Sequence, residues 1–207
     1  NTAAGVGKLY SVANSGVATL LSTLAADPAD TADGNTAYTA LSGANFAVDF
    51  NPVPDRLRVV SDTGQNLRIN VTTGATITDI SLTTAGDTAT PRTGVSAAAY
   101  TNSIFDGGSA QTTQSTALYA IDSSTDQLVR IGDDPAAGGA CTAGTANNAA
   151  NPNCGVVTNI GALGFDVGAS NGFEIDAVTG VALLAATVGA NTTLYSVNLG
   201  TGAATAA

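Results

Sequence analysis

The sequence predicts an all-β fold, in which four-stranded meanders repeat in a β-propeller-like arrangement that is incomplete or open. Short apolar or alternating runs bounded by Gly, Asn and Asp recur along the 207 residues, whereas helical periodicity is weak throughout. Strand–turn–strand units also repeat, which is typical of propeller blades. A β-sandwich whose hairpins resemble one another is the alternative.

The clearest repeat is a hairpin of two apolar strands joined by a turn rich in Asn, Asp, Thr and Gly. Glycine in such a turn can take a positive φ, and Asn or Asp side chains can bond the turn's backbone. The four copies span residues 9–21, 67–77, 118–129 and 194–205. Each copy is therefore predicted to form a β-hairpin.

Further strands precede three of these hairpins. They are predicted at 46–50 and 57–60 before the second copy, at 98–101 before the third, and at 173–176 and 181–184 before the fourth. Complete meanders are thus expected at 46–80 and 172–206, with a shorter copy at about 97–132. We expect one domain over 1–207, with long loops near 25–44 and 133–155.

Composition limits the partners. Charged residues make up 11% of the chain and the net charge is −10, so the basic footprint that nucleic-acid binding requires is missing. No apolar run reaches the roughly 18 residues of a membrane span. The chain begins at Asn1 and contains no Met, which we interpret as processing of a secreted protein. An extracellular or cell-surface location is expected.

The two cysteines, Cys141 and Cys154, lie in a stretch rich in Gly, Ala and Asn. A metal site would need further ligands, and the chain has no His and no third Cys. We predict a disulfide that closes this short loop and contributes about 3 kcal/mol. Such a bond also indicates an oxidising compartment.

Several runs carry a family resemblance. The strongest are 48–52 (VDFNP) and 55–68 (DRLRVVSDTGQNLR), and supporting matches lie at 99–103, 172–176, 194–199 and 201–205. The chain resembles the bacterial domain of unknown function 4394. The resemblance implies a secreted, propeller-like protein in surface or matrix contexts, and it brings no catalytic residues. Family domains usually carry a further repeat before the first hairpin, and here the chain starts almost at that hairpin.

Enzymatic chemistry finds little support. Without His, a Ser–His–Asp or Cys–His site cannot form. The carboxylate pairs Asp49–Asp55 and Glu174–Asp176 could in principle serve glycoside hydrolysis. Asp49 and Glu174 occupy equivalent places in their repeats, however, which favours a structural role in each copy. We therefore predict a protein that is not an enzyme.

Two polar groups require separate interpretation. The densest comprises Asp55, Arg56, Arg58, Asp62, Gln65, Asn66 and Arg68. Cross-strand pairing would make it an ion-pair network that fixes the sheet, or alternatively a site for an anion or a saccharide carboxylate. Asp27, Asp30 and Asp33 suggest calcium, but their spacing fits no EF-hand loop. We favour a solvated acidic loop and predict no cofactor.

The first hairpin offers only the last two strands of a meander, which leaves a strand edge unpaired. Strand addition between subunits would satisfy that edge and, repeated head to tail, give an open homo-polymer. The function expected is a structural subunit of an extracellular filament, sheath or surface matrix. Candidate contacts are Lys8, Leu9, Tyr10, Val12, Leu194, Tyr195, Val197 and Leu199. The alternative is a monomeric binding module for a small anion or glycan, and a glycan or matrix component is the second partner class.

Overall fold

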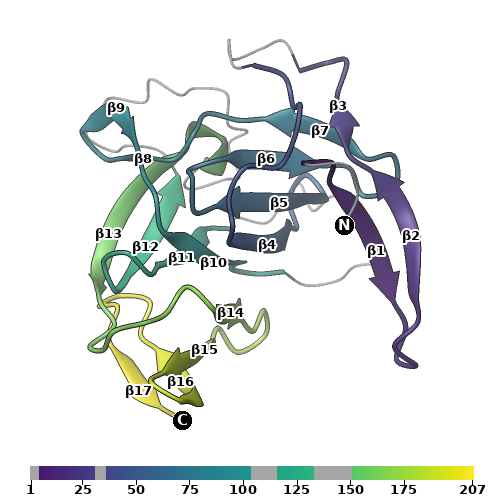
Figure 1. The fold of residues 1–207 in the computed structure, drawn as a ribbon. Helices are drawn as coiled ribbons and strands as arrows, with labels where there is room; N and C mark the ends of the chain where they lie inside the picture. Colours follow the sequence, from purple (N-terminus) through teal and green to yellow (C-terminus); the bar gives the residue numbers. More distant parts are fainter. Residues whose placement is uncertain (1–4, 31–35, 104–115, 133–150) are drawn as a thin grey trace.

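A computed structural model describes residues 5–30, 36–103, 116–132 and 151–207 (Figure 1). It is all-β, as predicted, with four open sheets and, among the described residues, one short 3-10 helix, η1 (Pro152–Cys154). The described strands do not close into a propeller. No helix within these ranges is long and apolar enough to cross a membrane.

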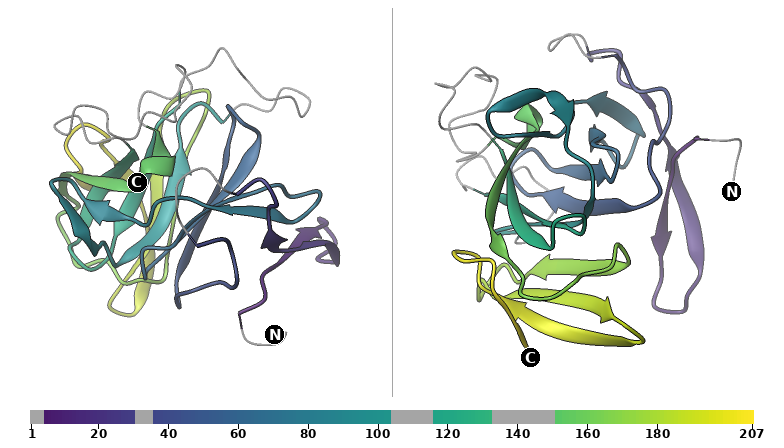
Figure 2. Two further views of the ribbon diagram at one scale, coloured as in Figure 1. Left: turned by 90° about the horizontal axis from the view of Figure 1, so that it is seen from above. Right: turned by 60° about the vertical axis from the view of Figure 1, so that its left-hand side comes forward.

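The first sheet is a two-stranded hairpin of β1 (Lys8–Val12) and β2 (Ala18–Thr23). It projects from the other sheets (Figures 1 and 2). Tyr10 lies opposite Leu20, and a register shift follows Leu9. The sequence predicted this hairpin because the Asn-Ser-Gly turn separates two apolar runs, and Gly16 takes a φ of 82° there.

The second sheet has the strand order β3-β7-β6-β5-β4. Its meander consists of β4 (Phe46–Asn51), β5 (Arg56–Ser61), β6 (Asn66–Ile69) and β7 (Ala75–Thr78). The short strand β3 (Ala25–Ala26) follows the hairpin and runs parallel to β7. A segment of the predicted 25–44 loop thus closes the outer edge of the meander that comes after it.

The third sheet has the order β10-β11-β12-β13-β8-β9. Its bounds are β8 (Thr83–Thr84), β9 (Asp87–Pro91), β10 (Val95–Tyr100), β11 (Leu118–Asp122), β12 (Gln127–Gly132) and β13 (Val156–Ala162). Here β8 runs parallel to β13, so the linker again closes the outer edge of the following meander.

The extent predicted for this middle meander, about 97–132, was wrong. The hairpin at 118–129 contains the second and third strands of the meander, and the fourth strand, β13, lies beyond residue 155. The turn between Asp122 and Gln127 carries the same Asp and Thr signals whichever pair of strands it joins. The residues of the turn therefore do not indicate whether it joins the second and third strands of a meander or the third and fourth.

The fourth sheet is a plain meander of β14 (Asn171–Ile175), β15 (Ala182–Val188), β16 (Asn191–Val197) and β17 (Ala204–Ala206). The turn before β17 contains Gly202, with a φ of 80°. A Cβ at Gly202 would lie 2.3 Å from the carbonyl oxygen of Gly161 on β13. Glycine is required here by the close approach of the two backbones.

The first strands of the three meanders, β4, β10 and β14, are neighbours, with β10 packed against both of the others. The views of Figure 2 show the sheets following one another in an arc. Three apolar clusters fill the spaces between consecutive sheets. The core is therefore divided among the sheet-to-sheet contacts.

Candidate functional site

Arg58 on β5 is the centre of the predicted polar cluster, and its side chain is 1% exposed. Its Nη1 donates to Asp79 Oδ2 at 2.6 Å and to Asn66 Oδ1 at 2.7 Å. Its Nε donates to the Tyr100 hydroxyl at 3.2 Å, and its Nη2 donates to Asn153 Oδ1 at 2.6 Å. All three guanidinium nitrogens thus have protein acceptors, which is the condition for burying this charge.

Arg68 on β6 shares the same carboxylate. Its Nε donates to Asp79 Oδ2 at 2.7 Å and its Nη2 to Asp79 Oδ1 at 2.8 Å, a bidentate geometry. Asn66 completes the network by donating to the backbone carbonyls of Ile80 and Pro152. The network therefore ties η1, from a distant part of the chain, to the second sheet.

The other four residues of the predicted cluster lie apart from this network. Asp62 accepts from the backbone of Ala44 and Asn45, and Gln65 bonds the backbone of Ala40 and Ser42. These two side chains hold the segment before β4. Asp55, with a φ of 52°, ends the turn between β4 and β5, and Arg56 is the first residue of β5, where its Nη1 donates to the carbonyls of Pro54 and Asp55.

Sequence reasoning missed Asp79, Tyr100 and Asn153. Asp79 directly follows β7, Tyr100 ends β10, and Asn153 lies in η1. Asn153 is 95 residues away from Arg58, and no motif signals such a partnership. The position of Arg58 in an apolar strand was the signal available, because an Arg between Leu57 and Val59 requires a buried acid.

A second carboxylate, Asp49 on β4, lies where the second and third sheets meet. Its Oδ2 accepts from the backbone N–H of Tyr100 on β10 at 2.6 Å, and its Oδ1 accepts from the N–H of Phe50. Burial raises the pKa of Asp49 to about 6, against the lowering effect of these bonds, and the nearby Glu174 carboxylate raises it further. Glu174 therefore lies close enough to act on the carboxyl group of Asp49.

Two of the three aspartates proposed for calcium, Asp27 and Asp30, lie in the described part of the acidic loop. Asp27 accepts from the N–H of Ala29, and Asp30 accepts from the N–H of Thr78, while Asp33 lies outside the described residues. Within the described ranges, no group of three potential metal-ligating side chains was found. Cys154 is 3% exposed, and Cys141 also lies outside the described residues, so their pairing stays a prediction.

The candidate assembly residues divide into two kinds. Lys8, Tyr10, Val12 and Leu194 are exposed. The others pack within the chain. Leu9 contacts the cluster beneath the hairpin, whereas Tyr195, Val197 and Leu199 belong to the contact between the third and fourth sheets.

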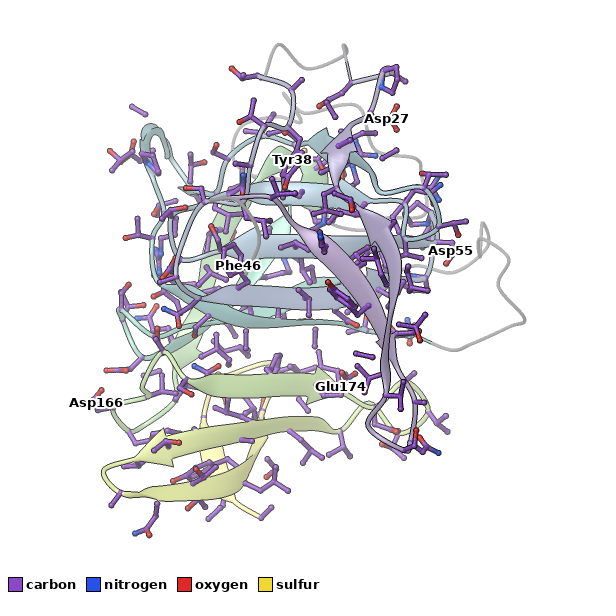
Figure 3. The ribbon with its side chains drawn as sticks, turned by 45° about the vertical axis from the view of Figure 1, so that its right-hand side comes forward. Asp27, Tyr38, Phe46, Asp55, Asp166 and Glu174 are labelled. Carbon is purple, nitrogen blue, oxygen red and sulfur yellow. The ribbon has the colours of Figure 1, made fainter. Side chains whose placement is uncertain are left out.

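One face of the second sheet is covered only in part. Cross-strand register aligns Val48 with Val59 and Leu67, and it aligns Phe50 with Leu57 and Ile69, so each row points to one side. The β5 and β6 members are at most 8% exposed and are covered by Leu9 of β1 and by Leu24, Tyr38 and Leu41 of the segment after the hairpin. In Figure 3 the hairpin runs in front of this sheet, where Phe46 of β4 and Tyr38 are labelled.

On the inner strand β4, by contrast, Val48 is 56% exposed and Phe50 is 47% exposed. The β2 end of the hairpin lies at the outer side of the sheet, where Ala25 donates to the carbonyl of Gly74. The other edge of β1, which is free among the described strands, lies on the side of the hairpin that faces the second sheet (Figure 1). We call this free edge, together with Val48 and Phe50, the β1 step.

The comparisons place the chain in a family of unknown function. A family model described as a domain of unknown function (DUF4394) matches residues 3–207. Neither the curated proteins nor the solved structures contain a match. The matched region includes the polar network of Arg58 and the β1 step. Over nearly its whole length, this chain belongs to the DUF4394 family.

Proposed function

We propose that this protein is a secreted, non-enzymatic structural subunit that self-associates into an extracellular filament, sheath or surface matrix. In this proposal the three meanders are blades of an open, β-propeller-like arc, because each presents its first strand beside the next and packs one apolar cluster against its neighbour. The hairpin of β1 and β2 represents the outer half of a further blade.

The β1 step is the observation that carries the proposal. Among the described strands β1 pairs with β2 alone, which leaves the backbone donors and acceptors of its other edge without a strand partner, and Val48 and Phe50 on β4 are exposed. Unpaired strand edges are templates for another strand, and a contiguous apolar surface beside one adds a hydrophobic gain. Strands from another molecule that occupy the β1 step would pair with the backbone of β1 and bury Val48 and Phe50 at the same time.

The alternative function, binding of a small anion or glycan, depended on the arginine cluster. All three nitrogens of the Arg58 guanidinium donate to protein acceptors, and two nitrogens of the Arg68 guanidinium donate to the Asp79 carboxylate. These arrangements favour an architectural role for the cluster. They leave the self-association proposal as the better supported one.

Light scattering and electron microscopy of the purified chain test the proposal. Over a concentration series near neutral pH and moderate salt, the mean mass is expected to rise with concentration, and regular polymers should appear in the micrographs. Moderate salt matters because the net charge of −10 repels like molecules at low ionic strength. A mass that stays at one chain across the series would refute the proposal.

A further inference from the structure

We infer that the β1 step receives the β16–β17 hairpin of a second copy of this chain, with β17 pairing along the free edge of β1 and Leu194 packing against Val48 and Phe50. This inference rests on the proposed function and names the partner segment. The contact is heterologous, because the step and the hairpin are different surfaces, so repetition builds an open polymer.

The outer edge of the fourth meander differs from the outer edges of the second and third sheets' meanders. The outer strands β7 and β13 each have a parallel strand from the preceding linker, β3 and β8 respectively. The corresponding outer strand of the fourth sheet, β17, has no strand beside it among the described residues. Its first residue is bonded outward, because the Ala204 N–H donates to the carbonyl of Leu163, and the end of the strand around Ala206 is left for pairing. Its residues, Ala204, Thr205 and Ala206, are small and uncharged, so another strand can approach without steric or electrostatic obstruction.

Side-chain alternation places an apolar group where the step needs one. On β16, Val197 points into the core and Tyr195 packs against it, whereas Leu194 and Ser196 are exposed. Leu194 is 46% exposed. A β17 strand added beside β1 brings β16 over β4, because adjacent strands lie about 4.8 Å apart. Leu194 can then cover the rows that end at Val48 and Phe50.

Charge distribution permits this pairing in an acidic protein. Residues 5–26 contain Lys8 and no acidic residue, and residues 177–207 contain no charged side chain. Docking the C-terminal hairpin on the first hairpin therefore brings no like charges together, although the chain carries −10 overall. An isologous contact between two β1 edges would instead place two Lys8 side chains at one interface without an acid on either hairpin.

Complementary charge variants test the contact. Phe50→Lys puts a cation on the step, and Leu194→Glu puts an anion on the docking hairpin. Each variant alone is expected to reduce self-association about tenfold or more, since a charge must then be buried without a partner. An equimolar mixture should restore association, because every contact in an alternating polymer either pairs the introduced cation with the introduced anion or keeps the native apolar pair.

Two measurements keep folding and location under control. Val178→Glu is the matched control, because Val178 is 84% exposed on the turn between β14 and β15 and belongs to neither surface. Val178→Glu should associate like the unmodified chain, and every variant should have the same far-UV circular dichroism spectrum as the unmodified chain. A photoreactive phenylalanine at position 50, in a mixture of ¹⁵N-labelled and unlabelled chains, should cross-link between chains to residues 191–207.

The outcomes separate this inference from the proposed function. If the chain associates but Phe50→Lys and Leu194→Glu do so normally, or if the mixture fails to recover, the inference is wrong while self-association stands. Cross-links within one chain, from hairpin to hairpin, or to any other segment also overturn it. If the unmodified chain does not associate at all, both ideas fall.

Discussion

Replacing Arg58 with alanine is expected to lower the free energy of unfolding by about 4 kcal/mol, because buried polar groups lose their partner and a cavity is left. The local geometry sets this size. Asp79 keeps its bidentate bond to Arg68, so its charge stays paired. Asn66 Oδ1 and Asn153 Oδ1 each lose a guanidinium donor, and an unsatisfied buried polar group costs about 1–3 kcal/mol. The space left by the side chain adds to the loss.

Urea unfolding of the unmodified chain, Arg58→Ala and Arg68→Ala measures the effect. Arg68 is 26% exposed, and its removal leaves the Arg58–Asp79 pair in place. Arg68→Ala should therefore cost less, about 1–2 kcal/mol. The unfolding midpoints should differ while the slopes stay equal. A loss below about 1 kcal/mol for Arg58→Ala, or an equal loss for Arg68→Ala, would contradict the assignment of Arg58 as the central support.

Three further predictions concern stability. The folded pKa of Asp49, about 6, lies above its ordinary value of 3.8, so ionisation opposes folding and this contribution to stability falls as pH rises from about 4 to 6. Asp49→Asn should remove that fall, gaining about 1–2 kcal/mol over the unmodified chain at pH 7 but not at pH 4; parallel pH profiles would exclude it. Gly202→Ala should cost at least about 2 kcal/mol in thermal unfolding, because its Cβ meets the Gly161 carbonyl at positive φ, and an unchanged midpoint would count against this packing. Cys154→Ser should cost about 3 kcal/mol, provided that mass spectrometry of the unreduced protein finds no free thiol; two alkylated cysteines would rule out the disulfide.

Local patterns in the sequence predicted most of the strands. The alternating and apolar runs at 46–50, 57–60 and 181–184 all became strands, because burial of one face and turn chemistry act over a few residues. Short strands such as β3 and β8 escaped prediction. They exist because the edges of β7 and β13 supply hydrogen-bond partners, which two residues cannot signal by themselves.

For the candidate site, too, local patterns predicted some features, whereas contacts between distant segments could not be predicted. The acidic partner expected for Arg58 exists, but it is Asp79, and residues in the cluster such as Asp62 are used elsewhere. Counting strands in the sequence was enough to predict that the first sheet has two strands, which holds for the described residues. Exposure of Val48 and Phe50 could not be predicted, because both lie in a run that reads as an ordinary buried strand, and their covering depends on how far a distant hairpin reaches.

The parallel pairings of β3 with β7 and of β8 with β13 have a consequence for how the chain comes apart. Each linker strand pairs with the last strand of the meander that follows it in the chain. Neither of these sheets can therefore separate from the preceding part of the chain until the linker strand has been released. The two sheets should therefore open as one cooperative unit rather than as independent repeats. Among the described residues the first hairpin has no such linker strand, and the fourth sheet has a single bond in its place, from the Ala204 N–H to the carbonyl of Leu163. The amide hydrogens of these two sheets should therefore exchange with solvent sooner than those of β5, β6, β11 and β12.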